Sequence, residues 1–113
     1  MKKQNKIRKR ADFVKVSRFD CSFRIRSIVV ICGPNGLDNW RVGFTATKKV
    51  GNAVVRNHCK RRMRAVADQL IPKMGKDGID YVFIAKAMTF GCEWKMLIKD
   101  TTAALLFLNR KVF

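Results

Sequence analysis

Hydrophobic and polar positions along the chain form local patterns that predict helices and strands. Residues 11–19 place Phe13 and Val16 three positions apart, which predicts a short helix with one apolar side. Residues 22–32 alternate at first and then become wholly apolar, as in a strand whose second half is buried on both faces. Residues 40–46 alternate throughout and predict another strand. Its apolar face carries Trp40, Val42, Phe44 and Ala46.

The segment Gly33-Pro34-Asn35-Gly36 separates these two strands and is a strong turn signal. Two strands around such a turn predict an antiparallel hairpin of residues 22–32 with residues 40–46. Farther along, the apolar run 80–85 has the length of a strand. Residues 93–108 carry apolar residues at helical spacing and predict a final helix.

A longer helix is predicted between the second and third strands. Asn52 is a suitable N-cap, and Pro72 and Gly75 are expected to end the helix after about Ile71. At 100° per residue one stripe is apolar, formed by Val55, Cys59, Met63, Val66 and Leu70. A neighbouring edge is basic, formed by Arg56, Lys60 and Arg64, with Asn57 and Arg61 beyond it. Charge and core therefore occupy different faces of one helix.

The predicted order is helix, strand, strand, helix, strand, helix. This order is typical of an α+β fold, here a two-layer sandwich with helices packed on a small sheet. A length of 113 residues suits one domain, and no repeat or linker divides the chain, so residues 1–113 are predicted to form a single domain. Residues 1–10 are almost all polar or basic, and we expect them to be mobile until a partner binds.

The charge balance of the chain indicates a protein that binds a polyanion. The chain has 25 Lys and Arg residues against 8 Asp and Glu residues, a formal net charge of +17. Such an excess opposes the compact state, and nucleic acid is the first partner expected to relieve it. No run of apolar residues is long enough to span a membrane, and the basic start precedes no apolar segment. We therefore expect a cytoplasmic protein without a membrane partner.

Catalysis by the chain alone is not favoured. The eight acids are scattered, whereas a metal-dependent nuclease needs clustered carboxylates. His58 is the only histidine, so an acid–base pair of histidines is excluded, and a structural or RNA-contacting role is favoured over a catalytic base. Four widely spaced cysteines with one histidine predict reduced thiols rather than a zinc site. We expect no catalytic residue, metal site or cofactor in this chain.

Residues 48–64 are the strongest candidate for a binding segment, because they hold seven basic residues and no acid. A solvated helix face would explain many such runs. However, Lys48 and Lys49 precede the helix N-terminus, where free backbone N–H groups also favour phosphate. The basic residues also lack the Glu partners that a merely solubilised helix usually carries. Contact with nucleic acid is therefore the favoured interpretation.

The same segment closely resembles the signature of the bacterial ribonuclease P protein subunit. The resemblance rests on Gly51-Asn52-Ala53-Val54-Val55-Arg56-Asn57, followed by Lys60-Arg61 and Arg64. Arg41-Val42-Gly43-Phe44-Thr45 and Lys48-Lys49-Val50 match the family's lead-in. Asp12-Phe13 is similar to its first-helix motif, and Asp80 opens its late strand. The resemblance covers nearly the whole chain.

This resemblance implies a subunit of a ribonucleoprotein endonuclease that removes the 5′ leader of precursor tRNA. It implies that the RNA subunit carries catalysis with Mg²⁺, and that the protein alone is inactive but binds the catalytic RNA and the leader. No obligate protein partner is evident. It also implies a mixed sheet in which the basic helix joins two parallel strands by a left-handed crossover. Patterning alone would predict a right-handed one.

Site residues carried over from the resemblance fall into two groups. The predicted RNA contacts are Lys48, Lys49, Asn52, Arg56, Asn57, His58, Lys60, Arg61 and Arg64. Phe13 and Phe44 are candidates for the leader cleft, where aromatic rings stack on unpaired bases; for Phe44, plain core packing is an equal alternative. Two positions depart from the family. His58 stands where an arginine is usual, and Ser17 stands where many members have a second aromatic residue.

Two other functions compete with this interpretation. A purely structural RNA-binding protein, such as a ribosomal component, would share the composition, and only the central motif disfavours it. A DNA-binding regulator would use residues 52–71 as a recognition helix. That arrangement needs a helical partner immediately upstream, and residues 40–50 are predicted to be strand instead.

Overall fold

The computed structural model describes residues 5–112 and shows an α+β fold, as predicted. The predicted helices and strands are present with shifted ends, except that the one strand expected over residues 22–32 forms two strands. The short helix α3 is an addition that the sequence pattern did not indicate. In chain order the elements are α1 (Arg10–Arg18), β1 (Ser22–Ile25), β2 (Ile28–Pro34), β3 (Arg41–Thr45), α2 (Ala53–Met74), β4 (Ile79–Ala85), α3 (Ala87–Gly91) and α4 (Trp94–Val112).

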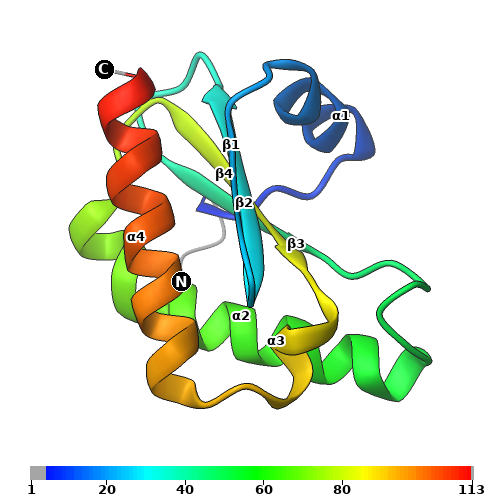
Figure 1. The fold of residues 1–113 in the computed structure, drawn as a ribbon. Coiled ribbons are helices and arrows are strands. Elements are labelled where there is room, and N and C mark those ends of the chain that lie inside the picture. Colours follow the sequence, from blue (N-terminus) through cyan, green and yellow to red (C-terminus); the bar gives the residue numbers. More distant parts are fainter. Residues whose placement is uncertain (1–4, 113) are drawn as a thin grey trace.

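The four strands form one mixed sheet in the order β1-β2-β4-β3 (Figure 1). Strand β2 is antiparallel to both β1 and β4, whereas β3 is parallel to β4. Because α2 connects β3 to β4, these three elements form the expected unit of two parallel strands joined by the basic helix. The left-handed sense of this crossover stays a prediction.

The predicted hairpin of residues 22–32 with residues 40–46 is wrong. The first segment folds back at Arg26 and Ser27, so β1 and β2 form the hairpin, and β4 lies between β2 and β3. Strand β2 is buried over most of its length and needs a neighbour on each side. The segment after β2 therefore crosses the end of β4 before it enters β3. Next to β4, the Asn35 N–H donates to the Gly78 carbonyl at 2.8 Å.

Helix α2 ends three residues later than predicted. Pro72 lies inside its last turn, and the helix continues to Met74 before Gly75. A proline removes one N–H donor and crowds the carbonyl four residues before it, and here this cost falls in the last turns of the helix. The Gly75 N–H still donates to the Ile71 carbonyl at 2.6 Å. Gly75 is therefore the residue that terminates the helix.

Helices α2 and α4 cover one face of the sheet and form the main core (Figure 1). The predicted apolar stripe of α2 is confirmed, because Cys59, Met63 and Val66 are fully buried. They pack with α4 and with the sheet residues that share this face. Helix α1 lies on the opposite face, where Val16 and Val82 belong to a smaller buried cluster. Much of that second face is left without a helix above it.

The N-terminal segment lies beside the free edge of β3. Lys6 forms a parallel bridge with Val42, and the Ile7 N–H donates to the Val42 carbonyl at 3.0 Å. Ile7 is buried. Residues 1–4, part of the segment expected to be mobile, lie outside the described residues. Across residues 5–112, none of the helices combines the length and apolar character needed to cross a membrane.

Candidate nucleic-acid interface

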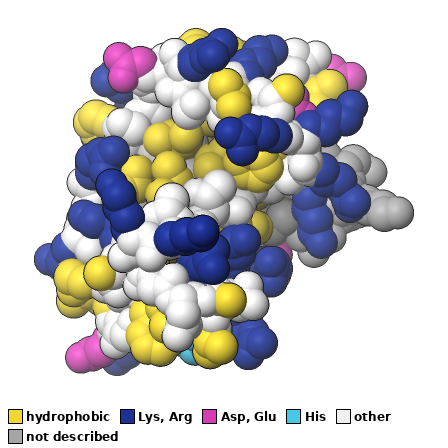
Figure 2. All heavy atoms as spheres, turned by 90° about the vertical axis from the view of Figure 1, so that its right-hand side faces the viewer, with side chains coloured by type: hydrophobic (Ala, Val, Ile, Leu, Met, Phe, Trp, Pro, Cys, Tyr) yellow, Lys and Arg dark blue, Asp and Glu magenta, His cyan; other side chains and the backbone are white. Residues whose placement is uncertain are grey.

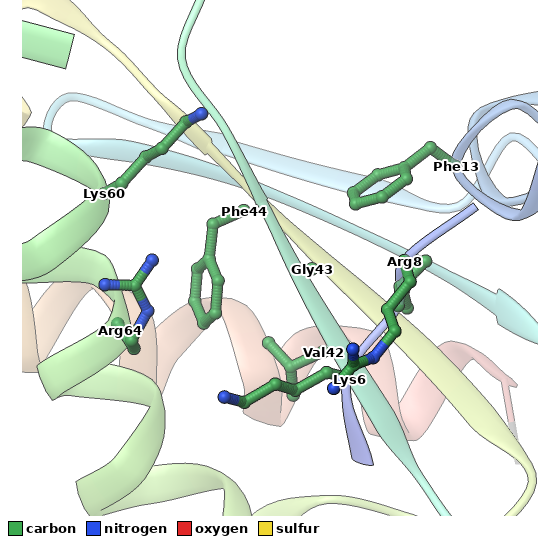
Figure 3. A pocket seen from close by; sticks show the side chains of 9 residues that line it. Lys6, Arg8, Phe13, Val42, Gly43, Phe44, Lys60 and Arg64 are labelled. Atoms are coloured by element: carbon green, nitrogen blue, oxygen red, sulfur yellow. The ribbon is translucent and has the colours of Figure 1, made fainter. Parts of the chain in front are cut away.

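A hollow of about 400 Å³ opens between the N-terminal segment, α1, β3 and α2. Figure 3 shows aromatic and cationic side chains entering it from these separate elements. Four of its side chains are cationic, and none of the described residues that line it is acidic. The lining consists of Lys6, Ile7, Arg8, Phe13, Val42, Gly43, Phe44, Lys60 and Arg64. The hollow therefore combines apolar surface with positive charge.

Phe44 packs against the core and also lines the hollow. Its ring meets the ring of Phe83 edge-on, with the centroids 5.7 Å apart, so it packs against the core. The guanidinium carbon of Arg64 lies 5.7 Å from the Phe44 ring centroid, within cation–π range. The half-buried Phe44 ring also lines the hollow. Core packing thus fixes one wall of the site.

Phe13 enters the hollow from α1 and is positioned by a partly buried ion-pair network. Arg41 of β3 binds both carboxylate oxygens of Asp80, at 2.9 and 2.6 Å, and lies 3.4 Å from Asp12. Hydrogen bonding to Asp80 raises the pKa of Arg41 above its ordinary value. Asn35 donates a further hydrogen bond to Asp80 at 2.9 Å. Because Asp12 precedes Phe13, this network ties the start of α1 to β3.

The basic edge of α2 faces the same hollow. Asn52 is the N-cap as predicted, because its side chain accepts a hydrogen bond from the Val55 N–H at 3.0 Å. Lys60 and Arg64 line the hollow. Other predicted RNA contacts of this segment do not line the hollow. Lys48 and Lys49 are exposed before α2, Asn57 and Arg61 are exposed on α2, and Arg56 on the same helix is half-buried.

Two other basic-segment residues lie on the opposite flank of α2, against α3. The His58 ring meets the Phe90 ring edge-on at 4.9 Å and does not line the hollow. The Arg62 guanidinium donates to the carbonyls of Thr89 and Cys92, at 2.7 and 2.6 Å. Arg62 is therefore held by the fold. The structure thus places His58 away from the hollow that Lys60 and Arg64 line.

A second hollow of about 260 Å³ adjoins the first along the open face of the sheet. Phe13 lines both hollows, and Ser17 lines the second. Its floor is aliphatic, formed by Ile31, Val82 and Ile84. Figure 2 views this side of the molecule and shows an apolar depression bordered by Lys and Arg side chains.

Sequence reasoning missed Lys6 and Arg8, which supply two of the four cations in the first hollow. The signal that could have found them is Ile7, the single large aliphatic residue in the run 2–10. An isolated apolar residue in a basic segment can anchor that segment to the core, which places its neighbours at the surface on either side. Burial of Ile7 does this here.

The described part of the chain contains no group of three or more His, Cys, Asp or Glu side chains that could hold a metal ion. Cys21 and Cys32 face each other with their sulfur atoms 3.5 Å apart. Burial raises the pKa of Cys32 and of Cys59, so both remain protonated thiols at neutral pH. A protonated thiol is a poor nucleophile and a poor metal ligand.

Known proteins resemble this chain in sequence and in fold. The sequence matches the Ribonuclease P family over residues 1–108. It is 35% identical to the ribonuclease P protein component of Paramagnetospirillum magneticum, over 89% of this chain and 80% of that protein. A Staphylococcus aureus RNase P protein mutant with defective mRNA degradation activity is 27% identical and has a TM-score of 0.79, covering 93% of this chain and 88% of that one. The Thermotoga maritima RNase P protein is 25% identical, with a TM-score of 0.75 and coverage of 93% and 96%. The chain therefore belongs to the ribonuclease P protein family.

Proposed function

We propose that this protein binds the catalytic RNA of ribonuclease P and the 5′ leader of precursor tRNA, and so assists removal of the leader. The observation that supports this most directly is the first hollow, where Phe13 and Phe44 lie among four cations. Aromatic rings stack on unpaired bases of any sequence, and neighbouring cations bind the phosphates between them. Its volume is that of a pocket for a small ligand, which suits a single strand rather than a duplex.

The catalytic RNA would contact the part of the basic segment outside the hollow. Lys48, Lys49, Asn57 and Arg61 are exposed there, next to the capped start of α2. Arg56, Lys60 and Arg64 continue this surface toward the hollow, so one helix would touch the catalytic RNA and the leader together. Asn52 would serve both as N-cap and as an RNA contact through its side-chain amide.

In this proposal the chemistry belongs to the RNA subunit, with Mg²⁺ bound by RNA phosphates, and this chain supplies no catalytic residue. It would act in the cytoplasm, with the RNA subunit and precursor tRNA as its partners. The S. aureus relative is described as a mutant with defective mRNA degradation activity. An assay of the purified protein alone therefore belongs with every test of this function.

The leader role is tested by comparing the affinity of the protein–RNA complex for precursor tRNA and for tRNA without a leader. Phe13→Ala should weaken binding of the precursor about tenfold, within the range of a lost base stack, and leave leaderless tRNA unchanged. Phe19→Ala is the control, because Phe19 is an exposed aromatic residue just after α1 that lines neither hollow. Equal losses for both tRNAs, or no loss, would count against a leader site at Phe13.

A further inference from the structure

Phe90 of α3 is an exposed aromatic residue that the leader site does not use. Its side chain is 44% exposed. It lies across α2 from the first hollow, on the flank that carries His58, and its ring meets the His58 ring edge-on at 4.9 Å. Val54, four residues before His58 on the same helix, is 75% exposed. These three residues, Val54, His58 and Phe90, form a small apolar surface, here called the α3 patch.

The backbone that carries Phe90 is held firmly. Arg62 donates to the carbonyls of Thr89, Phe90 and Cys92, and these bonds fix the end of α3. The buried Thr89 hydroxyl donates to the Ser27 carbonyl and accepts from the Lys86 N–H. Phe90 is thus presented to solvent from a rigid support. A ring held in this way loses little conformational freedom when it meets a flat ligand.

The charges around the α3 patch favour RNA over an apolar protein surface. On α2 and just before it, no acid occurs in residues 48–67, and Arg61, three residues after His58, is exposed on the same side of the helix. Beyond α3, the exposed Glu93 is the acid closest in sequence to Phe90. Arg62 adds a second positive charge close to Phe90, because its guanidinium donates to the Phe90 backbone carbonyl at 3.2 Å. Aromatic faces flanked by cations are the usual surface for stacking an unpaired base.

We propose that Phe90 and His58 form a stacking platform for an unpaired base of the RNA subunit. This inference rests on the proposed function, because it requires that the protein bind that RNA. It also explains the departure at position 58. An imidazole ring can pack edge-on against Phe90 and present an aromatic surface, whereas an arginine there would supply a phosphate contact instead.

The test measures the dissociation constant of the full-length protein and a bacterial ribonuclease P RNA at several salt concentrations. Phe90→Ala should weaken binding about tenfold, and Phe90→Trp should restore most of the loss. The slope of affinity against salt should not change, because no phosphate contact is removed. Phe107→Ala is a closely matched control: Phe107 is 43% exposed and its ring meets Phe23 at 5.0 Å, but it lies on α4.

Each result is decisive once folding is verified by circular dichroism. If wild-type protein binds the RNA and Phe90→Ala binds equally well, the platform is refuted while the proposed function stands. If wild-type protein does not bind the RNA, the proposed function itself fails. Should Phe90→Ala disturb the fold, Phe90→Leu keeps most of the apolar volume without the aromatic face. Undiminished binding by that variant would likewise refute the platform.

Discussion

The ring of Phe13 occupies the space that a side chain at Gly43 would need. A Cβ atom added to Gly43 would lie 2.5 Å from Cε1 and 2.7 Å from Cζ of Phe13, closer than atoms of this kind approach. Helix α1 can therefore place an aromatic ring directly against the backbone of β3. Glycine at position 43 is a requirement of the hollow's geometry.

Gly43→Ala should displace the Phe13 ring and weaken leader binding to a similar extent as Phe13→Ala. Binding of the catalytic RNA should be retained, because the exposed basic residues of α2 are untouched. The measurement is again affinity for precursor and leaderless tRNA. Combining Gly43→Ala with Phe13→Leu relieves the clash, so it should recover folding stability without recovering leader affinity. Full recovery of leader affinity in that double variant would show that the aromatic ring is not needed.

Adjacent arginines on α2 should behave differently. Arg62→Ala removes a charged donor from the end of α3 and should lower the free energy of unfolding by about 1.5–3 kcal/mol. Arg61 is exposed, so Arg61→Ala should change stability by less than about 0.5 kcal/mol while lowering the salt slope of RNA binding by about one. Urea unfolding measures the stability of both variants, and RNA binding at several salt concentrations measures their salt slopes. The reverse pattern would mean that the roles are assigned wrongly.

Buried aspartates give a second matched pair. Arg41→Ala leaves Asp80, 3% exposed, without its main cation and should cost about 3–5 kcal/mol of stability. Arg26→Ala removes the cation from Asp100, but Arg26 is 52% exposed and Asp100 keeps its 2.7 Å bond from Ser27, so the cost should be about 1 kcal/mol or less. Comparable losses on chemical unfolding would contradict the assignment of Arg41 as the buried partner.

Stability should fall at alkaline pH through Tyr81. Burial raises the pKa of Tyr81 to about 12, above its ordinary value near 10. The folded state therefore holds this proton more tightly than the unfolded state. The contribution of protonated Tyr81 to the free energy of unfolding is complete below pH 10 and is lost as the pH rises toward 12. Lysines titrate in the same range, so the wild-type protein is compared with Tyr81→Phe. The wild type should lose more stability between pH 9.5 and 11.5, and identical pH profiles would contradict the assignment.

Helix α2 could be predicted from the sequence because its signals are local. The Asn52 cap, the apolar stripe through Cys59 and Met63 and the neighbouring basic edge all follow from a 3.6-residue period. Phe44 was placed on an apolar strand face by the same kind of reasoning. These features depend on residues close in sequence, so the chain pattern specifies them.

Strand pairing could not be predicted in this way. The break at Ser27 is stabilised by Asp100, 73 residues away, and nothing near Ser27 indicates that contact. The second edge of β2 pairs with β4, which follows much later in the chain. The turn signal at Gly33 does not specify which strand pairs with that edge. The first hollow was likewise only half predicted, because Lys6 and Arg8 reach it through the burial of Ile7.

The most direct test of the central claim is cleavage of a precursor tRNA at low magnesium concentration. The reaction compares the purified protein, a bacterial ribonuclease P RNA, and the two together. We expect the protein alone to be inert and the pair to restore correct 5′ processing. Replacing Arg56 and Asn57 should then reduce this rescue. Binding of the RNA without rescue would indicate a purely structural RNA-binding protein. Cleavage by the protein alone, persisting after rigorous removal of contaminating nuclease, would contradict the assignment of catalysis to the RNA.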